Sequence, residues 1–256
     1  MSTTTLTANH LEKPPVDIKT LSDKEKQELI SSDSVSITSG TTLSPDTAFQ
    51  PAKSLHINTK GTPVLRLPLP LKELQISIHN ADGSLAYLST RAQRNSGNCV
   101  LSNADEKQSI ATTYFFGPGR DPVLHLLGED AEIKTASKWT SRSQKFIMPD
   151  GRSFEWEYKR AKGFGDEGKK GTALVLSMGG KRLAALIRNS QTRTEGSKSC
   201  SAGNGGELVL GEDVGGKEGL SEDVVVATCL LMLKKEVDRR RTVQIMMITA
   251  AVSGGS

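Results

Sequence analysis

The chain has 256 residues, a formal net charge of +4 and 36% hydrophobic residues, enough for one large domain or two small ones with a core. Its cysteines, Cys99, Cys200 and Cys229, are odd in number and far apart, without C-x-x-C spacing. This argues against a disulfide framework and a zinc site, and it fits a reducing compartment. The N-terminus lacks a basic segment followed by an apolar one, and the chain has no N-x-S/T sequon. We expect a cytoplasmic protein, with a peripheral membrane position and the nucleus left open.

Charge is distributed unevenly along the chain. Residues 1–50 carry four Lys and seven Asp or Glu, a net charge of −3, so the remaining residues carry +7. A basic folded part attracts anionic partners such as lipid headgroups, nucleic acid or phosphorylated peptides, although a mildly basic domain is also ordinary.

Residues 1–50 are rich in Ser and Thr and poor in large apolar residues. Such a segment cannot bury enough surface to offset the entropy of ordering it, so we expect a flexible arm. Ser22 and Glu25 form a capping-box pattern that predicts a short helix over residues 22–31. This helix could be a docking segment, but a solvated tail is favoured.

From Leu55 onward the chain shows short alternating runs typical of strands, separated by turn residues. The run at 64–67, which leads into Pro68 and Pro70, predicts an edge or crossing strand. The loop Asn80–Gly83 predicts a hairpin in which His79 pairs with Ser84. Further strands are expected around 55–57, 74–78, 85–87, 99–101, 110–116, 123–127, 132–138, 146–148, 154–158, 172–178, 181–185 and 207–210.

Two further turns set strand register. Pro149–Gly151 pairs Phe146 with Phe154 and Lys145 with Glu155, which places aromatic against aromatic and opposite charges together. The turn Gly179-Gly180 predicts the pairs Met178–Lys181, Leu176–Leu183 and Leu174–Ala185. The Gly- and Ser-rich stretch Thr192–Gly206 is interpreted as a long mobile loop.

The run Val224–Leu233 follows the helix cap Ser221 and is apolar on every face. Such a helix must be buried all round or lie in a membrane, and charged residues from Lys234 onward interrupt it before the roughly 20 residues that a membrane span needs. We therefore predict a mainly β, α+β domain over residues 51–256, a closed antiparallel barrel of about twelve strands around a central C-terminal helix. A sandwich with the helix across one face is the alternative, but it leaves one side of the helix wet.

Three runs, Tyr114–Arg120, Phe154–Trp156 and Val224–Arg241, resemble those of fungal members of the tubby C-terminal-like group, which includes tubby proteins, phospholipid scramblases and LURP-one-related proteins. The resemblance covers residues 53–256 and rests on architecture and loose patterns. It implies a barrel of about twelve strands around a central helix. It also implies phosphoinositide binding through basic residues on the barrel. No tubby lipid-binding motif matches position by position, so no residue is carried over.

Other motifs do not indicate catalysis. Gly163–Gly168 matches G-x-G-x-x-G, but the β-like run that follows favours a glycine-rich hairpin loop over a nucleotide site. The four histidines are isolated, and no nucleophile–base arrangement can be singled out. Lys234–Arg241 could be a nuclear-localisation patch, but the solvated end of a buried helix is preferred. We expect no enzyme activity, cofactor or metal.

Two functions remain open. The first is a non-enzymatic binding module for anionic phospholipid headgroups; the second is a structural or regulatory domain that contacts proteins through its arm and long loops. Nucleic acid is not expected as a partner, and a monomer is expected. Basic residues near strand ends are the candidates for lipid contact: Lys138, Arg142, Lys159, Arg160, Lys181 and Arg182.

Overall fold

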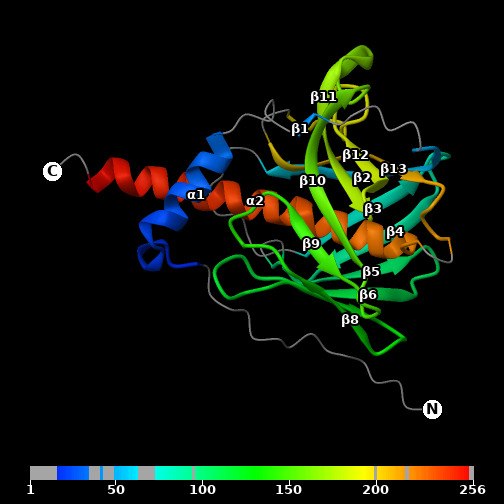
Figure 1. Cartoon of the computed structure of the whole chain (residues 1–256), viewed down its shortest axis with the longest axis horizontal. Helices are drawn as coiled ribbons and strands as arrows, with labels where there is room; N and C mark the ends of the chain where they lie inside the picture. The colour runs from blue at the N-terminus through cyan, green and yellow to red at the C-terminus, as the bar shows by residue number, and fades with distance from the viewer. Residues whose placement is uncertain are drawn as a thin grey trace.

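The computed structural model describes residues 16–34, 41–42, 49–62, 73–93, 96–198, 201–216 and 219–253. A twelve-stranded antiparallel sheet runs in chain order from β2 to β13 and closes where β13 pairs with β2, which confirms the predicted barrel (Figure 1). The strands are β2 (Pro51–Thr62), β3 (Leu74–Asn80), β4 (Leu85–Arg91), β5 (Cys99–Asn103), β6 (Gln108–Thr113), β7 (Val123–Leu126), β8 (Ala131–Thr135), β9 (Gln144–Ile147), β10 (Ser153–Lys162), β11 (Lys170–Met178), β12 (Lys181–Ile187) and β13 (Ala202–Gly211). A two-residue strand, β1 (Thr41–Thr42), adds in parallel to β10.

The helix α2 (Glu222–Ser253) runs through the barrel and projects from one end (Figure 1). Every side chain from Val224 to Leu233 is at most 4% exposed, because inward-facing residues of the strands surround this half of the helix. Trp156 of β10 is fully buried and donates from Nε1 to Thr228 Oγ1 at 2.9 Å. The buried central helix is therefore confirmed, and the sandwich alternative is excluded.

The hairpin around Pro149–Gly151 has the predicted register. Phe146 pairs with Phe154 and Lys145 with Glu155, and the two phenyl rings stack with centroids 5.1 Å apart. Alternation of apolar and charged residues was sufficient to predict this pairing because no bulge interrupts it.

The registers predicted for the other two hairpins are wrong, except for the first pair of the Gly179-Gly180 hairpin. In the Gly179-Gly180 hairpin Met178 does face Lys181, but an irregularity between Leu176 and Ser177 places Leu176 opposite Ala184. A similar irregularity next to the Asn80–Gly83 loop places His79 opposite Leu85 instead of Ser84. A bulge sets two residues against one, and local patterning does not reveal it.

The mobile-loop interpretation of Thr192–Gly206 is wrong at its C-terminal end, where residues 202–206 begin β13 and are buried. Glycine allows this strand to approach its neighbours: a Cβ on Gly203 would lie 2.5 Å from Val237 Cγ2, and one on Gly205 would lie 1.9 Å from Ile57 O. The strand predicted over 64–67 lies outside the described residues.

Part of the N-terminal arm is folded. The short helix η1 (Ile18–Thr20) leads into α1 (Asp23–Ser34), and the capping box is formed, since Ser22 N donates to Glu25 Oε2 at 3.0 Å. Leu21 and Leu29 are buried against Val243 and Met246 on the projecting half of α2. The solvated-tail interpretation is therefore wrong for this segment, while the flexibility expected of residues 1–15, 35–40 and 43–48 lies outside the described residues.

Candidate functional site

The six predicted basic residues do not form one patch. Lys159 and Arg160 lie near the end of β10, Lys181 and Arg182 begin β12, and the other two precede β9. Met178 of β11 pairs with Phe154 of β10 on one side and with Lys181 of β12 on the other. Lys181 therefore lies at the same height in the sheet as Phe154. Phe154 is five residues before Lys159, which corresponds to about 17 Å along the strand. The structure thus separates the Lys181–Arg182 pair from the Lys159–Arg160 pair.

Several of these cations have structural partners. The Arg142 guanidinium lies over the Tyr158 ring at 4.6 Å, and that of Arg182 lies over the Phe49 ring at 3.8 Å. Lys159 forms an ion pair with Glu157, and Lys138 Nζ is 3.9 Å from Glu28 on α1. Replacing Arg182 would therefore also remove aromatic packing, so it is a poor probe of lipid contact.

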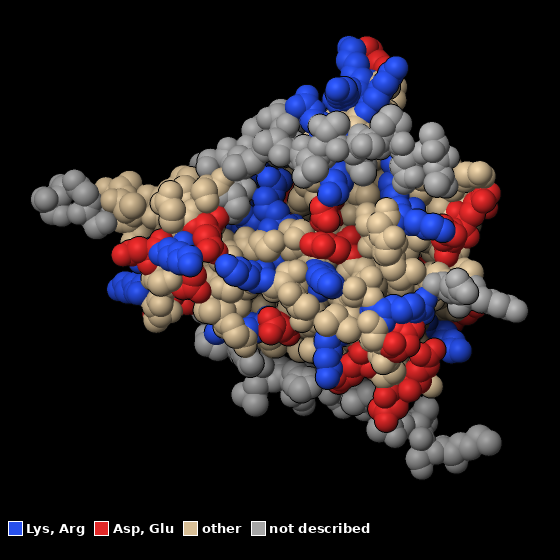
Figure 2. Space-filling view, viewed as in Figure 1, with Lys and Arg blue, Asp and Glu red and all other residues tan. Residues whose placement is uncertain are grey.

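A different basic surface lies at the tip of the β10–β11 hairpin, where Figure 2 shows Lys and Arg side chains gathered at the top of the molecule. Lys162 of β10 pairs directly with Lys170 of β11, and both are exposed. Arg160 lies on the same face of the ribbon, two residues before Lys162. Within the described chain no carboxylate lies within ion-pairing distance of Lys162 or Lys170. We call Arg160, Lys162 and Lys170 the hairpin cations.

The loop that joins these strands is Gly163–Lys169, which confirms the hairpin interpretation of the glycine-rich motif. Phe164 folds back onto the outer face of the sheet and packs on Ala173 and Val175. Asp166 Oδ1 accepts hydrogen bonds from the backbone N and the Oγ of Ser190, both at 2.6 Å. These hydrogen bonds hold the pKa of Asp166 below its usual value. The loop is therefore anchored, and the hairpin cations sit on an ordered support.

Part of the segment Lys234–Arg241, expected as a solvated helix end, is buried: Lys234, Lys235 and Arg239 are buried, and the other residues are half-buried. Lys234 is 5% exposed and donates to Asp238 Oδ1 at 2.6 Å. Glu236 accepts from Arg188 Nη1 at 2.8 Å and from Tyr158 Oη at 3.2 Å. Burial alone would raise the pKa of Glu236, but the Arg188 guanidinium outweighs it and the pKa is lowered. These pairs let a charged helix segment lie inside the barrel mouth.

Sequence reasoning missed Lys162 and Lys170, although it recognised the loop between them. Reading residues 159–172 as a hairpin would have placed the two lysines opposite each other, since they flank the glycine-rich turn. The strand assigned to 154–158 stops before Lys162, and the one assigned to 172–178 starts after Lys170, so neither includes a lysine of this pair.

Comparisons with known proteins give no relative: no family model, no curated protein and no solved structure matches this chain. Among the described residues, no helix has the length and apolar character needed to cross a membrane. The same residues contain no group of three or more His, Cys, Asp or Glu side chains that could hold a metal ion.

Proposed function

We propose that this domain is a non-enzymatic binding module that recognises anionic membrane lipids, with phosphoinositides as the lipid class implied by the resemblance to tubby-like barrels. The observation that carries the proposal is the directly opposed pair Lys162 and Lys170 at the tip of the hairpin. Like charges directly opposite each other destabilise a strand pair, so this arrangement is unfavourable for the isolated hairpin. An anionic surface would relieve it.

The hairpin is suited to such a surface for two reasons. Its tip projects from the barrel and carries two lysines with no carboxylate partner in the described chain, so little pairing must be broken on binding. Each Lys or Arg near an anionic bilayer contributes about 1 kcal/mol, so the three hairpin cations give weak binding that depends on salt. The hydrogen bonds to Asp166 already order the loop, which limits the entropy lost on binding.

Vesicle co-sedimentation tests the proposal. Neutral phosphatidylcholine vesicles are compared with vesicles that also contain phosphatidylserine or a phosphoinositide. We expect Lys162→Glu/Lys170→Glu to abolish the preference for acidic vesicles. A control variant with the same change in net charge, Lys107→Glu/Lys134→Glu, reverses two exposed lysines in other hairpins and is expected to keep it. If both variants lost the preference for acidic vesicles to the same extent, binding would depend only on net charge, and the proposed site would be wrong.

A protein-interaction domain is the second candidate function. It is favoured by the projecting end of α2, where Ile245, Met247 and Ile248 are 52%, 54% and 55% exposed. Exposed apolar side chains close together are typical of surfaces that contact other proteins. The vesicle experiment distinguishes the two candidates, because a domain that binds only proteins shows no preference for acidic vesicles.

A further inference from the structure

The last turns of α2 form an apolar end that the barrel does not enclose. Residues 242–256 contain no charged side chain. The N-terminal helix α1 covers one face of this segment by packing on Val243 and Met246. Three large apolar side chains on the other faces are more than half exposed, and we call them the helix tip: Ile245, Met247 and Ile248.

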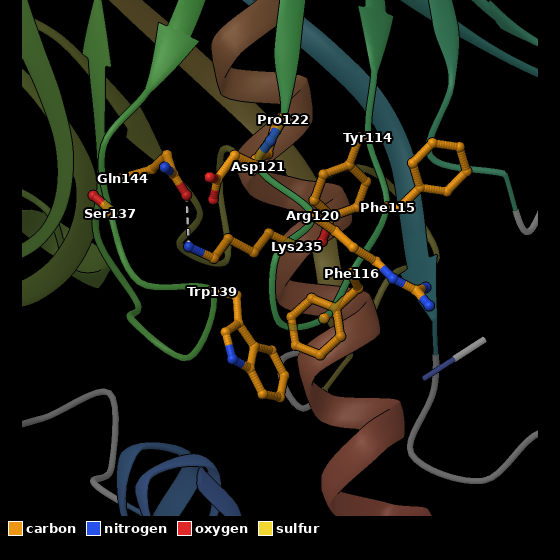
Figure 3. A pocket seen from close by; sticks show the side chains of 11 residues that line it. Tyr114, Phe115, Phe116, Arg120, Asp121, Pro122, Ser137, Trp139, Gln144 and Lys235 are labelled. Atoms are coloured by element: carbon orange, nitrogen blue, oxygen red, sulfur yellow. Dashed lines mark hydrogen bonds between the residues drawn. The ribbon is translucent and has the colours of Figure 1, made fainter. Parts of the chain in front are cut away.

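The covered side and the helix tip face in different directions. Met246 and Ile248 are two residues apart, which corresponds to about 200° around the helix axis, so α1 lies on the side of α2 opposite Ile248. The hollow in Figure 3 belongs to the covered side, where the rings of Phe116 and Trp139 meet edge to face at 5.1 Å. In Figure 1 the end of α2 extends beyond α1. The rest of the described chain therefore leaves the helix tip in solvent.

Arginines precede the helix tip on the same faces of α2. Arg240 lies seven residues before Met247, and seven residues correspond to two turns, so the two side chains share a face. Arg241 and Ile248 are related in the same way, and both arginines are half-buried. Along these faces the helix thus changes from basic to apolar towards its end. A bilayer changes in the same order, from anionic headgroups to hydrocarbon.

The helix tip and the hairpin cations lie at the same end of the barrel. Arg152, next to the β9–β10 turn, donates from Nη1 to Gly219 O at 3.5 Å, so α2 enters the barrel where that turn lies. It leaves at the opposite end, which is also the end of the β10–β11 turn, because β10 runs from one end to the other. In Figure 2 the hairpin forms the upper corner of the molecule and the end of α2 the left corner, and one flat surface can touch both.

The hairpin cations of β10 also point towards α2. Tyr158 of β10 donates from Oη to Glu236 Oε2 of α2 at 3.2 Å, so its side chain is on the inner face of the sheet. Arg160 and Lys162 follow at intervals of two residues in an uninterrupted register, so their side chains leave β10 on this same face. The hairpin and the projecting end of α2 therefore border one side of the molecule.

We infer that the helix tip enters the outer hydrocarbon of an anionic bilayer while the hairpin cations contact its headgroups. This inference rests on the proposed function and adds a second, apolar contact to it. Residues 247–253 of α2 are about 10 Å long, which fits the 5–10 Å depth to which interfacial helices are buried. Arg240 and Arg241 then lie at the level of the headgroups.

A second protein chain fits the helix tip less well than a bilayer does. Three half-exposed side chains offer at most a few hundred Å² of apolar surface. A specific protein interface buries about 800 Å² on each partner. A bilayer accepts a small apolar projection without a complementary surface, and the hairpin cations supply the rest of the contact.

Vesicle binding by matched variants of the whole chain tests the inference. Ile245→Ser/Ile248→Ser should weaken binding to phosphatidylserine vesicles by about tenfold or more at every salt concentration, because salt does not screen an apolar contact. Leu85→Ser/Ile147→Ser is the control, since it replaces two side chains that are 38% and 37% exposed. These lie next to the β3–β4 and β9–β10 turns, at the end of the barrel away from the helix tip, and binding should not change.

A tryptophan probe measures insertion directly. On phosphatidylserine vesicles the added fluorescence of Ile248→Trp should shift to shorter wavelength and be quenched by lipids brominated in their acyl chains. Ile147→Trp should show neither change, and both variants share the background of Trp139 and Trp156.

The outcomes separate this inference from the proposed function. If Lys162→Glu/Lys170→Glu loses the preference for acidic vesicles but Ile245→Ser/Ile248→Ser binds as the wild type does, the inference is overturned and the proposed function stands. If the wild type does not bind acidic vesicles, both are wrong. If the wild type self-associates in sedimentation and Ile245→Ser/Ile248→Ser abolishes only that, the helix tip is a protein interface and the inference is again overturned.

Discussion

Trp156 Nε1 donates a hydrogen bond to Thr228 Oγ1 at 2.9 Å, and both side chains are fully buried. This contact joins the middle of β10 to the middle of the apolar half of α2. Thr228 Oγ1 also donates back to Val224 O at 2.7 Å, so its hydroxyl is satisfied both as donor and as acceptor. The pair fixes the position of the helix along the barrel axis, because sliding the helix by one residue would leave a buried indole N–H without an acceptor.

Thr228→Val should therefore destabilise the protein by about 1–3 kcal/mol, since it keeps the shape of the side chain and leaves Trp156 Nε1 unsatisfied. Urea unfolding followed by tryptophan fluorescence measures the loss. The double variant Trp156→Phe/Thr228→Val removes both partners and should lose less than the sum of the two single variants. Strict additivity would show that the hydrogen bond contributes nothing.

Leu230 tests how completely the barrel encloses the helix. It is 1% exposed, so Leu230→Ala should lower the free energy of unfolding by about 2–5 kcal/mol. Ile248→Ala, on the exposed end of the same helix, is the control and should change it by less than about 0.5 kcal/mol. A fragment of residues 53–219 lacks the helix and should not unfold cooperatively. A cooperative melt of this fragment would mean that the helix is not needed for folding.

Gly203 tests the close packing of β13 on α2. It has a φ of +71°, and an added Cβ would lie 2.5 Å from Val237 Cγ2 and 2.9 Å from Leu233 O. Gly83 also has a positive φ, +85°, but nothing lies within 4 Å of its added Cβ. Both Gly203→Ala and Gly83→Ala should lower stability because alanine disfavours a positive φ. Only Gly203→Ala should also overpack its surroundings, which should lower the free energy of unfolding by a further amount of about 1–3 kcal/mol. Equal melting temperatures for the two variants would contradict this packing.

The partly buried pair Arg188–Glu236 predicts an acid-sensitive contribution to stability. The pKa of Glu236 is lowered in the folded state, so the pair stabilises the protein above the usual carboxyl value of 4.5 and is lost as the pH falls through the lowered pKa. Glu236→Gln leaves the partly buried Arg188 without its countercharge and should destabilise by about 1–3 kcal/mol at neutral pH. Glu167→Gln, in the exposed pair with Lys169, should change stability by less than about 1 kcal/mol. The difference in unfolding free energy between wild type and Glu236→Gln should shrink below pH 4.5; a difference independent of pH would exclude this role.

The features that could be predicted from the sequence depend on neighbours in the chain. Val224–Leu233 has no polar face, so its burial follows from composition alone, and the Phe146–Phe154 register follows from alternation across a three-residue turn. Bulges at Leu176 and His79 could not be predicted, because they depend on how each strand curves to close the barrel.

The candidate sites depend on contacts that are distant in sequence. Tyr158 and Glu236 are 78 residues apart and meet only because α2 is threaded through the finished barrel. The charged segment after Leu233 was expected in solvent, because a sequence pattern does not show that Arg188 of the β12 end lies beside Glu236. The pairing of Lys162 with Lys170 could have been predicted more easily, because both belong to one hairpin and the position of its turn determines which residues face each other.

Binding of the wild type to acidic and neutral vesicles across a series of salt concentrations shows whether the hairpin cations hold the domain on anionic membranes, as we propose. We expect binding to acidic vesicles at low salt, weaker binding as the salt rises, and none to neutral vesicles, because exposed charges are screened within about 10 Å at 0.1 M salt. The same weak binding to acidic and neutral vesicles at low salt would contradict it.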